Sequence, residues 1–210
     1  MVKLVVLNKF VEEQNILDNL YLFAQRGNIN VLKNYMKKAQ DNYSCGFNWL
    51  HVGAITGELE GSINWFSVVK KAQNNNNISP LHFACINPDV QVLWKLYSVN
   101  PDYSSSDFTQ RKLVHYAAAN HFEQVMEFLI AKGIPCNDKD AWGNTPLMIA
   151  ASLGWIQTVL VLLKESKKQL ENLDEDDEDY HIMMKTADFI NSIGPLKKTA
   201  LHFAVESSSF

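Results

Sequence analysis

The feature that most constrains the fold is a short phrase that returns along the chain at nearly regular intervals. Three clear copies occupy residues 78–84 (ISPLHFA), 144–150 (NTPLMIA) and 198–204 (KTALHFA), and weaker ones occupy residues 20–24, 49–54 and 113–118. The anchor residues are Leu20, Leu50, Leu81, Val114, Leu147 and Leu201, at intervals of 30, 31, 33, 33 and 54 residues. Such a repeat predicts small supersecondary units that bury their apolar faces only by stacking on one another.

Each phrase carries the signals that begin a helix. Ser79, Thr145 and Thr199 can cap a first helix with a hydroxyl,. Pro80 and Pro146 stand at the first helical position, where a missing N–H costs little,. Apolar residues at helical spacing then predict a second helix in each repeat, as in residues 90–96, 125–129 and 159–163,.

The skeleton T-P-L-H-x-A at a period near 33 resembles the ankyrin repeat, a β-turn followed by two antiparallel helices,. Asp107 and Asp140, seven residues before an anchor, match the Asp that opens the family's turn, and residues 151–154 match its A-x-x-G. The resemblance covers nearly all of the chain and implies an all-α ankyrin-repeat solenoid with about five full repeats and an incomplete sixth. It implies a structural role for Leu50, His51, Leu81, His82, His115, Thr145, Pro146, Leu147, Leu201 and His202.

These boundaries predict four segments. Residues 1–17 are expected to form an N-terminal capping helix, residues 18–170 repeats one to five, residues 171–194 an acidic insertion, and residues 195–210 an incomplete sixth repeat. The insertion contains the run Asp174–Asp179, which we expect to be a solvated loop, with recognition of a basic partner or of Ca²⁺ as alternatives,. Since a solenoid without a polar capping repeat exposes an apolar face, the open sixth repeat suggests a longer protein or a covering partner chain.

Composition and missing motifs argue against several functions. A net charge of −4 and a pI near 5.8 give no support to nucleic-acid binding,. Cys45, Cys85 and Cys136 form no C-x-x-C pair, and they favour a reducing, cytoplasmic compartment,. No apolar stretch reaches bilayer length, and no catalytic or nucleotide-binding motif is present,. The sequence therefore predicts a protein that is not an enzyme, with no cofactor, metal ion or membrane insertion.

Four histidines occupy one equivalent repeat position: His51, His82, His115 and His202. The resemblance implies that each ring hydrogen-bonds across the turns of adjacent repeats. Equivalent positions lie about one repeat apart, too far for shared ligands at roughly 2 Å from a metal. We therefore interpret these histidines as structural.

The resemblance implies a protein partner on the concave face, at the turn tips and the exposed ends of the first helices. The corresponding residues are Phe47, Ile78, Ile86, Phe108, Arg111, Trp142, Asn144 and Leu153. Trp142 is prominent because Trp and Arg are enriched at binding hot spots, although packing against Phe108 or Arg111 is an equal alternative. The sequence thus predicts a scaffold or adaptor; the alternatives are a regulatory or tethering arm of a larger protein and a fixed subunit of a large assembly.

Overall fold

The structure is a computed structural model that describes residues 49–57, 59, 77–99, 103–171 and 188–207. The chain divides into two compact units, Met1–Asn100 and Pro101–Phe210, here called the N-terminal and C-terminal units. Every regular element within the described ranges is helical, as the resemblance predicted. The predicted capping helix at residues 1–17 and most of the acidic insertion lie outside these ranges.

In the N-terminal unit, the described helices are α3 (Trp49–Thr56), α5 (Pro80–Ala84) and α6 (Val90–Val99). Helix α5 packs against both α3 and α6. Leu81, Phe83, Leu93 and Leu96 are each at most 2% exposed and fill the space between these helices. The side chain of Asn87 joins the repeats, because its Nδ2 donates to the carbonyls of Ala54 (3.0 Å) and Ile55 (2.9 Å) at the end of α3.

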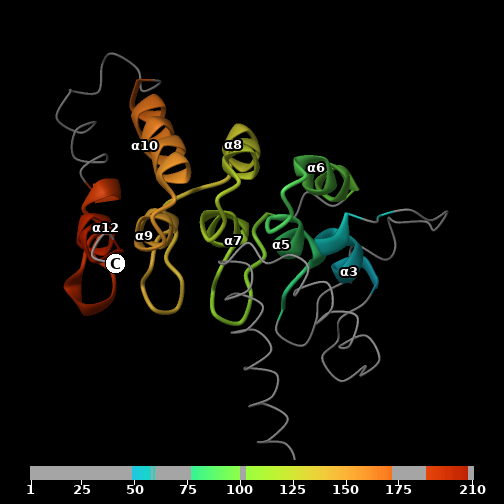
Figure 1. The fold of residues 1–210 in the computed structure, drawn as a ribbon, viewed down its shortest axis with the longest axis horizontal. Coiled ribbons are helices and arrows are strands. Elements are labelled where there is room, and N and C mark those ends of the chain that lie inside the picture. Colours follow the sequence, from blue (N-terminus) through green and yellow to red (C-terminus); the bar gives the residue numbers. More distant parts are fainter. Residues whose placement is uncertain (1–48, 58, 60–76, 100–102, 172–187, 208–210) are drawn as a thin grey trace, which may run out of the picture. The chain divides into compact units, whose positions relative to one another are not determined.

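The C-terminal unit contains α7 (Leu113–Ala118), α8 (Glu123–Ala131), α9 (Pro146–Ser152), α10 (Ile156–Glu171) and α12 (Ala200–Ser207), with a 3₁₀ turn at Pro195–Lys197. Figure 1 shows the first helices α7, α9 and α12 side by side in one row, the second helices α8 and α10 in another, and long loops hanging below. Helix α9 packs against both α7 and α12, and α10 packs against α8 and α9. Two layers of short antiparallel helices thus share one core.

The predicted helix signals act as expected at α9. The Thr145 hydroxyl accepts a hydrogen bond from the backbone N–H of Met148 (3.3 Å), and Pro146 is the first helical residue. The helix ends at Leu153, and Gly154 follows it with φ of +70°. This left-handed conformation favours glycine, because a Cβ there would crowd the following carbonyl.

Helix α12 is covered on one side only by the described helices. Ala200 is 7% exposed, and the Ser207 hydroxyl donates to the carbonyl of Ala151 in the preceding repeat (3.1 Å). The anchor Leu201, in contrast, is 71% exposed, whereas the equivalent Leu147 is 3% exposed. Leu201 therefore does not pack between described helices as Leu147 does, since no described helix lies beyond α12. His202 is exposed, and its Nδ1 accepts from the backbone N–H of Thr199 (3.2 Å).

Candidate functional site

The loops below the helices of the C-terminal unit are here called fingers. The first finger comprises residues 103–112, the second residues 137–145 and the third residues 191–199. Each finger precedes a first helix, namely α7, α9 and α12 in turn. They are built by local hydrogen bonding, since they contain no helix apart from the 3₁₀ turn of the third.

A buried aspartate organises each of the first two fingers. Asp107 Oδ1 accepts from the backbone N–H groups of Thr109 and Arg111 (both 2.8 Å), while its Oδ2 accepts from the Tyr116 hydroxyl (2.8 Å). Asp140 Oδ1 accepts from the backbone N–H groups of Trp142 (3.0 Å) and Asn144 (2.8 Å).

Both carboxylates curl the chain into the same tight turn by accepting N–H groups two and four residues further on. Asp107 and Asp140 are the residues that the sequence identified as opening the turn, and these hydrogen bonds confirm that role.

Neighbouring fingers are joined by direct contacts. The backbone N–H of Ala141 donates to the carbonyl of Thr109 (2.8 Å), which ties the second finger to the first. Lys139 Nζ donates to the carbonyl of Ile193 (2.9 Å), which ties the third finger to the second. The three fingers therefore form a continuous edge of the C-terminal unit.

The hydrogen bonds at the histidine position are consistent with the structural role that the sequence predicts for it. His115 Nδ1 accepts from the backbone N–H of Lys112 (3.1 Å), so the ring proton lies on Nε2, which donates to the carbonyl of Asp138 in the next finger (3.1 Å). His51 Nε2 likewise lies 2.9 Å from the carbonyl of Ile78. One ring thus caps its own helix and holds the next repeat.

Burial keeps these rings neutral. Desolvation lowers the pKa of His51 from 6.5 to about 4, against the smaller raising effect of its hydrogen bond to Ile78. The pKa of His115 is also lowered, chiefly by burial, although the nearby carboxylate of Asp140 acts in the opposite direction. Among the residues that the structure describes, no cluster of three or more His, Cys, Asp or Glu is placed to hold a metal ion.

The Trp142 side chain is the centre of the exposed edge. It is 50% exposed, and the Arg111 guanidinium lies over its ring at 4.7 Å from the ring centroid. Arg111 is itself held by Asp140, with its Nε 3.3 Å from Asp140 Oδ2. The alternative of packing against Arg111 therefore holds, and the stack still leaves half of the indole at the surface.

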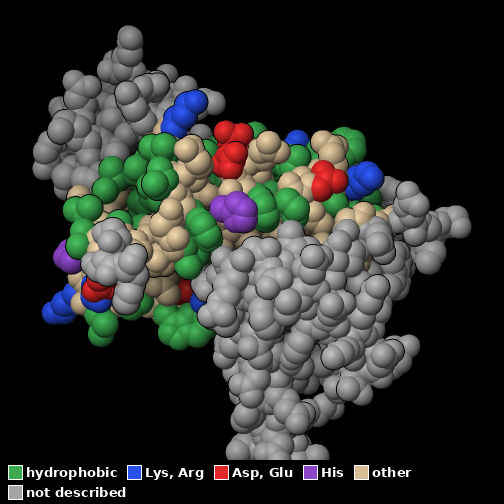
Figure 2. Space-filling model, in the orientation of Figure 1, with side chains coloured by type: hydrophobic (Ala, Val, Ile, Leu, Met, Phe, Trp, Pro, Cys, Tyr) green, Lys and Arg blue, Asp and Glu red, His purple; other side chains and the backbone are tan. Residues whose placement is uncertain are grey.

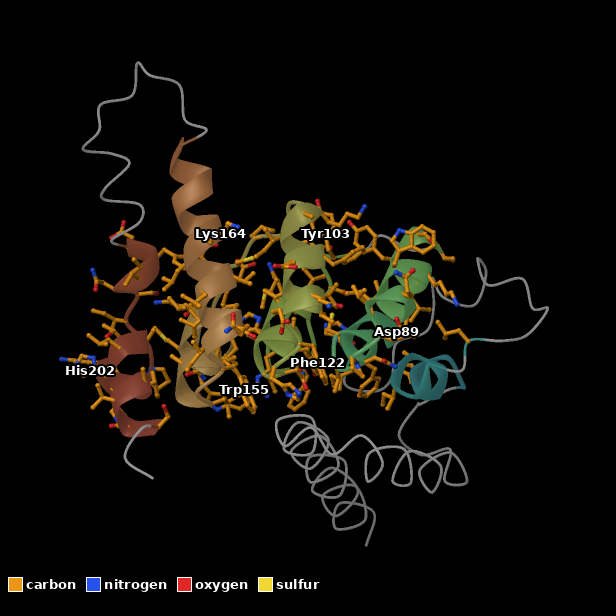
Figure 3. The ribbon with its side chains drawn as sticks, turned by 45° about the horizontal axis from the view of Figure 1, so that its top comes forward. Asp89, Tyr103, Phe122, Trp155, Lys164 and His202 are labelled. Carbon is orange, nitrogen blue, oxygen red and sulfur yellow. The ribbon has the colours of Figure 1, made fainter. Side chains whose placement is uncertain are left out.

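A second aromatic group lies where first helices give way to second helices. Trp155 Nε1 donates to the carbonyl of Ala119 (3.2 Å), and the His121 ring lies 5.3 Å from the Trp155 ring and 4.3 Å from the Phe122 ring. Figure 3 shows Phe122 and Trp155 next to each other along one side of the C-terminal unit. Leu153, which is partly buried, comes two residues before Trp155.

The structure distributes the predicted partner-binding residues unevenly. Phe108, Arg111, Trp142 and Asn144 gather on the first two fingers, although the Asn144 amide is engaged with Asp140. Ile78 and Ile86 are 1% and 3% exposed, so they belong to the core of the N-terminal unit and we leave them out of the surface proposed below. Phe47 lies outside the described residues.

Sequence reasoning missed Leu196, which is 85% exposed on the third finger, and the aromatic group around Trp155. The repeat register contained a signal for Leu196, since it precedes Leu201 by five residues, as Trp142 precedes Leu147. The Trp155 group had a weaker signal, because aromatic residues also fill the cores of such repeats.

Comparison with known proteins matches this geometry. A family model described as ankyrin repeats (3 copies) matches residues 81–174 and, overlapping them, residues 114–210. The chain belongs to the ankyrin-repeat family. Ankyrin repeats generally mediate protein–protein interaction.

Curated relatives are much longer proteins. The chain is 32% identical over 159 residues to the poly [ADP-ribose] polymerase tankyrase of Caenorhabditis elegans, covering 75% of this chain and 7% of that protein. It is 29% identical to the nuclear factor NF-kappa-B p105 subunit of Rattus norvegicus, covering 65% and 15%. It is 30% identical to the transient receptor potential cation channel subfamily A member 1 of Homo sapiens, covering 65% and 12%.

The ankyrin chain therefore spans at most 15% of the length of these relatives. Within the described ranges, no helix combines the length and apolar character needed to cross a membrane.

Proposed function

We propose that this ankyrin chain is a non-catalytic scaffold or adaptor that holds a protein partner against its fingers and the exposed ends of its first helices. The observation that carries the proposal is the fixed, half-exposed indole of Trp142. Asp140 orients Arg111, and Arg111 covers one part of the ring, so the indole is held in place before a partner arrives. A side chain ordered in advance loses little entropy on binding.

Other features support a protein partner. Trp and Arg are the residue types most enriched at binding hot spots. Phe108 on the neighbouring finger is 39% exposed and extends the apolar surface. The side chains of Cys85 and Cys136 are buried, and the cysteines form no C-x-x-C pair, so we expect the module to work in a reducing compartment such as the cytoplasm.

A second proposal is that the repeats form a regulatory or tethering arm of a larger protein, or a fixed subunit of a large assembly. The length of the relatives favours the arm. The exposed face of α12, with Leu201 at 71% and Val205 at 59% exposure, favours a neighbour that covers it in either case.

The test is affinity capture of the tagged chain from its own cell extract, followed by mass spectrometry at moderate and at high salt. The variant is Trp142→Ala, and the matched control is Trp94→Ala, since Trp94 is a similarly exposed Trp (51%) on helix α6 of the N-terminal unit. We expect the Trp142 variant to lose its partners at least tenfold and the Trp94 variant to retain them, with unchanged circular dichroism in both.

The outcomes separate the proposals. Stoichiometric partners that survive high salt would indicate a fixed subunit, whereas salt-labile partners would indicate an adaptor. Equal capture by the wild type and both variants would refute the finger surface.

A further inference from the structure

The fingertips of the C-terminal unit present a row of exposed apolar side chains. Phe108, Trp142 and Leu196 are 39%, 50% and 85% exposed on the first, second and third fingers. In Figure 2, hydrophobic side chains lie along the lower edge of the described part of this unit, where Figure 1 draws the finger loops. We call these three residues the apolar row.

The contacts between fingers place members of the apolar row next to one another. Phe108 precedes Thr109, whose carbonyl accepts from Ala141 N–H, and Ala141 precedes Trp142. Trp142 precedes Gly143, and Gly194 approaches so closely that a Cβ added to it would lie 3.3 Å from the Gly143 carbonyl oxygen. Leu196 follows Gly194 by two residues, so the three members of the row lie on consecutive fingers whose backbones approach one another.

The backbone of Leu196 has an unfavourable conformation. Its backbone is left-handed, with φ of 56° and ψ of 24°, a region where Cβ crowds the following carbonyl oxygen,. It is also the most exposed of the large hydrophobic side chains that the structure describes. Backbone strain combined with apolar exposure contributes nothing to folding, and such positions gather at binding sites.

The fingers differ in charge from the chain as a whole. The three fingers contain five cations, Arg111, Lys112, Lys139, Lys197 and Lys198, and three carboxylates, Asp107, Asp138 and Asp140, so they carry a net charge of +2, in a chain of net charge −4. Two of the carboxylates, Asp107 and Asp140, are 5% and 4% exposed and accept N–H groups of their own fingers.

The remaining cations divide into two groups. Lys112 is paired with Asp138 and Lys198 with Glu206. Lys139 and Lys197 are exposed, and neither forms an ion pair with a carboxylate in the described part of the chain. Among the described residues of the fingers, the exposed charges without a carboxylate partner are therefore positive.

From this combination we propose that the apolar row binds a linear, acidic segment of another protein, with apolar side chains for the row and carboxylates for Lys139 and Lys197. The inference rests on the proposed function, because it names the class of partner for the same surface. Stacked helices are spaced about 8–10 Å apart. A segment in the polyproline II conformation advances about 3.1 Å per residue with three residues per turn, so residues three positions apart lie on the same side of it. Apolar residues three positions apart therefore match neighbouring fingers.

The test is a selection of random 12-residue peptides, displayed on phage, against the immobilised full chain. We expect the enriched peptides to be net acidic and to carry apolar residues three positions apart. In fluorescence anisotropy, an enriched peptide should bind at least tenfold more weakly to Trp142→Ala and to Leu196→Ser than to the wild type, and equally well to Trp94→Ala. The double variant Lys139→Glu, Lys197→Glu should prefer the same peptide with its acidic residues changed to Lys.

Several results would overturn the inference: no enrichment, enriched peptides that are neutral or basic, affinity that survives both apolar-row variants, or equal competition by single-stranded DNA. If the Trp142→Ala variant loses its partners in the capture experiment but the selection gives no acidic peptides, the proposed function is retained. Only the class of partner is then overturned. Failure of both experiments would remove both.

Discussion

The neutral state of His51 makes a quantitative prediction about stability and pH. The ring is fully buried, and its Nε2 lies 2.9 Å from the carbonyl of Ile78. Burial lowers its pKa in the folded chain to about 4, against 6.5 for the ordinary side chain. The folded chain therefore binds fewer protons at this site than the unfolded chain at any pH between these two values.

This difference in pKa makes the free energy of unfolding depend on pH. Because the pKa of His51 is lower in the folded chain, the stability that its neutral ring contributes is complete above pH 6.5 and is lost as the pH falls through 6.5 towards 4. The whole difference is worth roughly 3 kcal/mol at 1.36 kcal/mol per pKa unit, and about 2 kcal/mol of it is lost between pH 7 and pH 5. His115, with its pKa also lowered, adds to the loss in the same direction.

The assay is urea unfolding at pH 7 and pH 5, followed by circular dichroism, for the wild type, His51→Gln and His202→Gln. Glutamine keeps a donor for the Ile78 carbonyl and does not titrate, so the His51 variant should lose about 2 kcal/mol less than the wild type between the two pH values. His202, whose ring is exposed on α12, is the matched control and should follow the wild type. An identical pH dependence in all three proteins would refute the reasoning.

Two further predictions concern α9 and α12. Leu147→Ala should destabilise the chain by about 2–5 kcal/mol, and Leu201→Ala by less than about 0.5 kcal/mol, because only Leu147 is buried,. Similar urea midpoints for both variants would contradict the assignment of α12 as covered on one side. Thr145→Ala should lower the free energy of unfolding by about 1 kcal/mol, because it removes the hydroxyl that accepts from Met148 N–H,. In thermal unfolding, Thr145→Ser should retain most of this stability, because serine keeps the acceptor.

Most of the architecture in the described residues could be predicted from the sequence because its signals are local and repeated. A Thr-Pro pair begins α9 and a glycine follows its end, so the helix bounds depend on residues within one repeat. The Asp that opens each finger acts through backbone N–H groups two and four residues away. Interactions of such short range can be predicted without knowledge of the tertiary structure.

The candidate surface was less predictable, because exposure depends on neighbours that lie far along the chain. Ile78 occupies a turn position like that of Asn144, yet its side chain is buried, and its own carbonyl lies 2.9 Å from Nε2 of His51. Leu196 shows the reverse: the sequence pattern did not single it out, yet it has a left-handed backbone and is 85% exposed. Neither outcome follows from residue type alone.

The double use of the His115 ring has a consequence for how the repeats fold together. Its Nδ1 stabilises the start of α7 while its Nε2 holds the finger that leads to α9, so the two helices are thermodynamically coupled through one side chain. In a linear array each repeat is coupled only to its nearest neighbours. Helix α12 has such coupling on one side in the described chain. Among the described helices of the C-terminal unit, we therefore expect opening to start at α12, where amide hydrogens should exchange before those of α7 and α9 and where a docked neighbour would stabilise these repeats most.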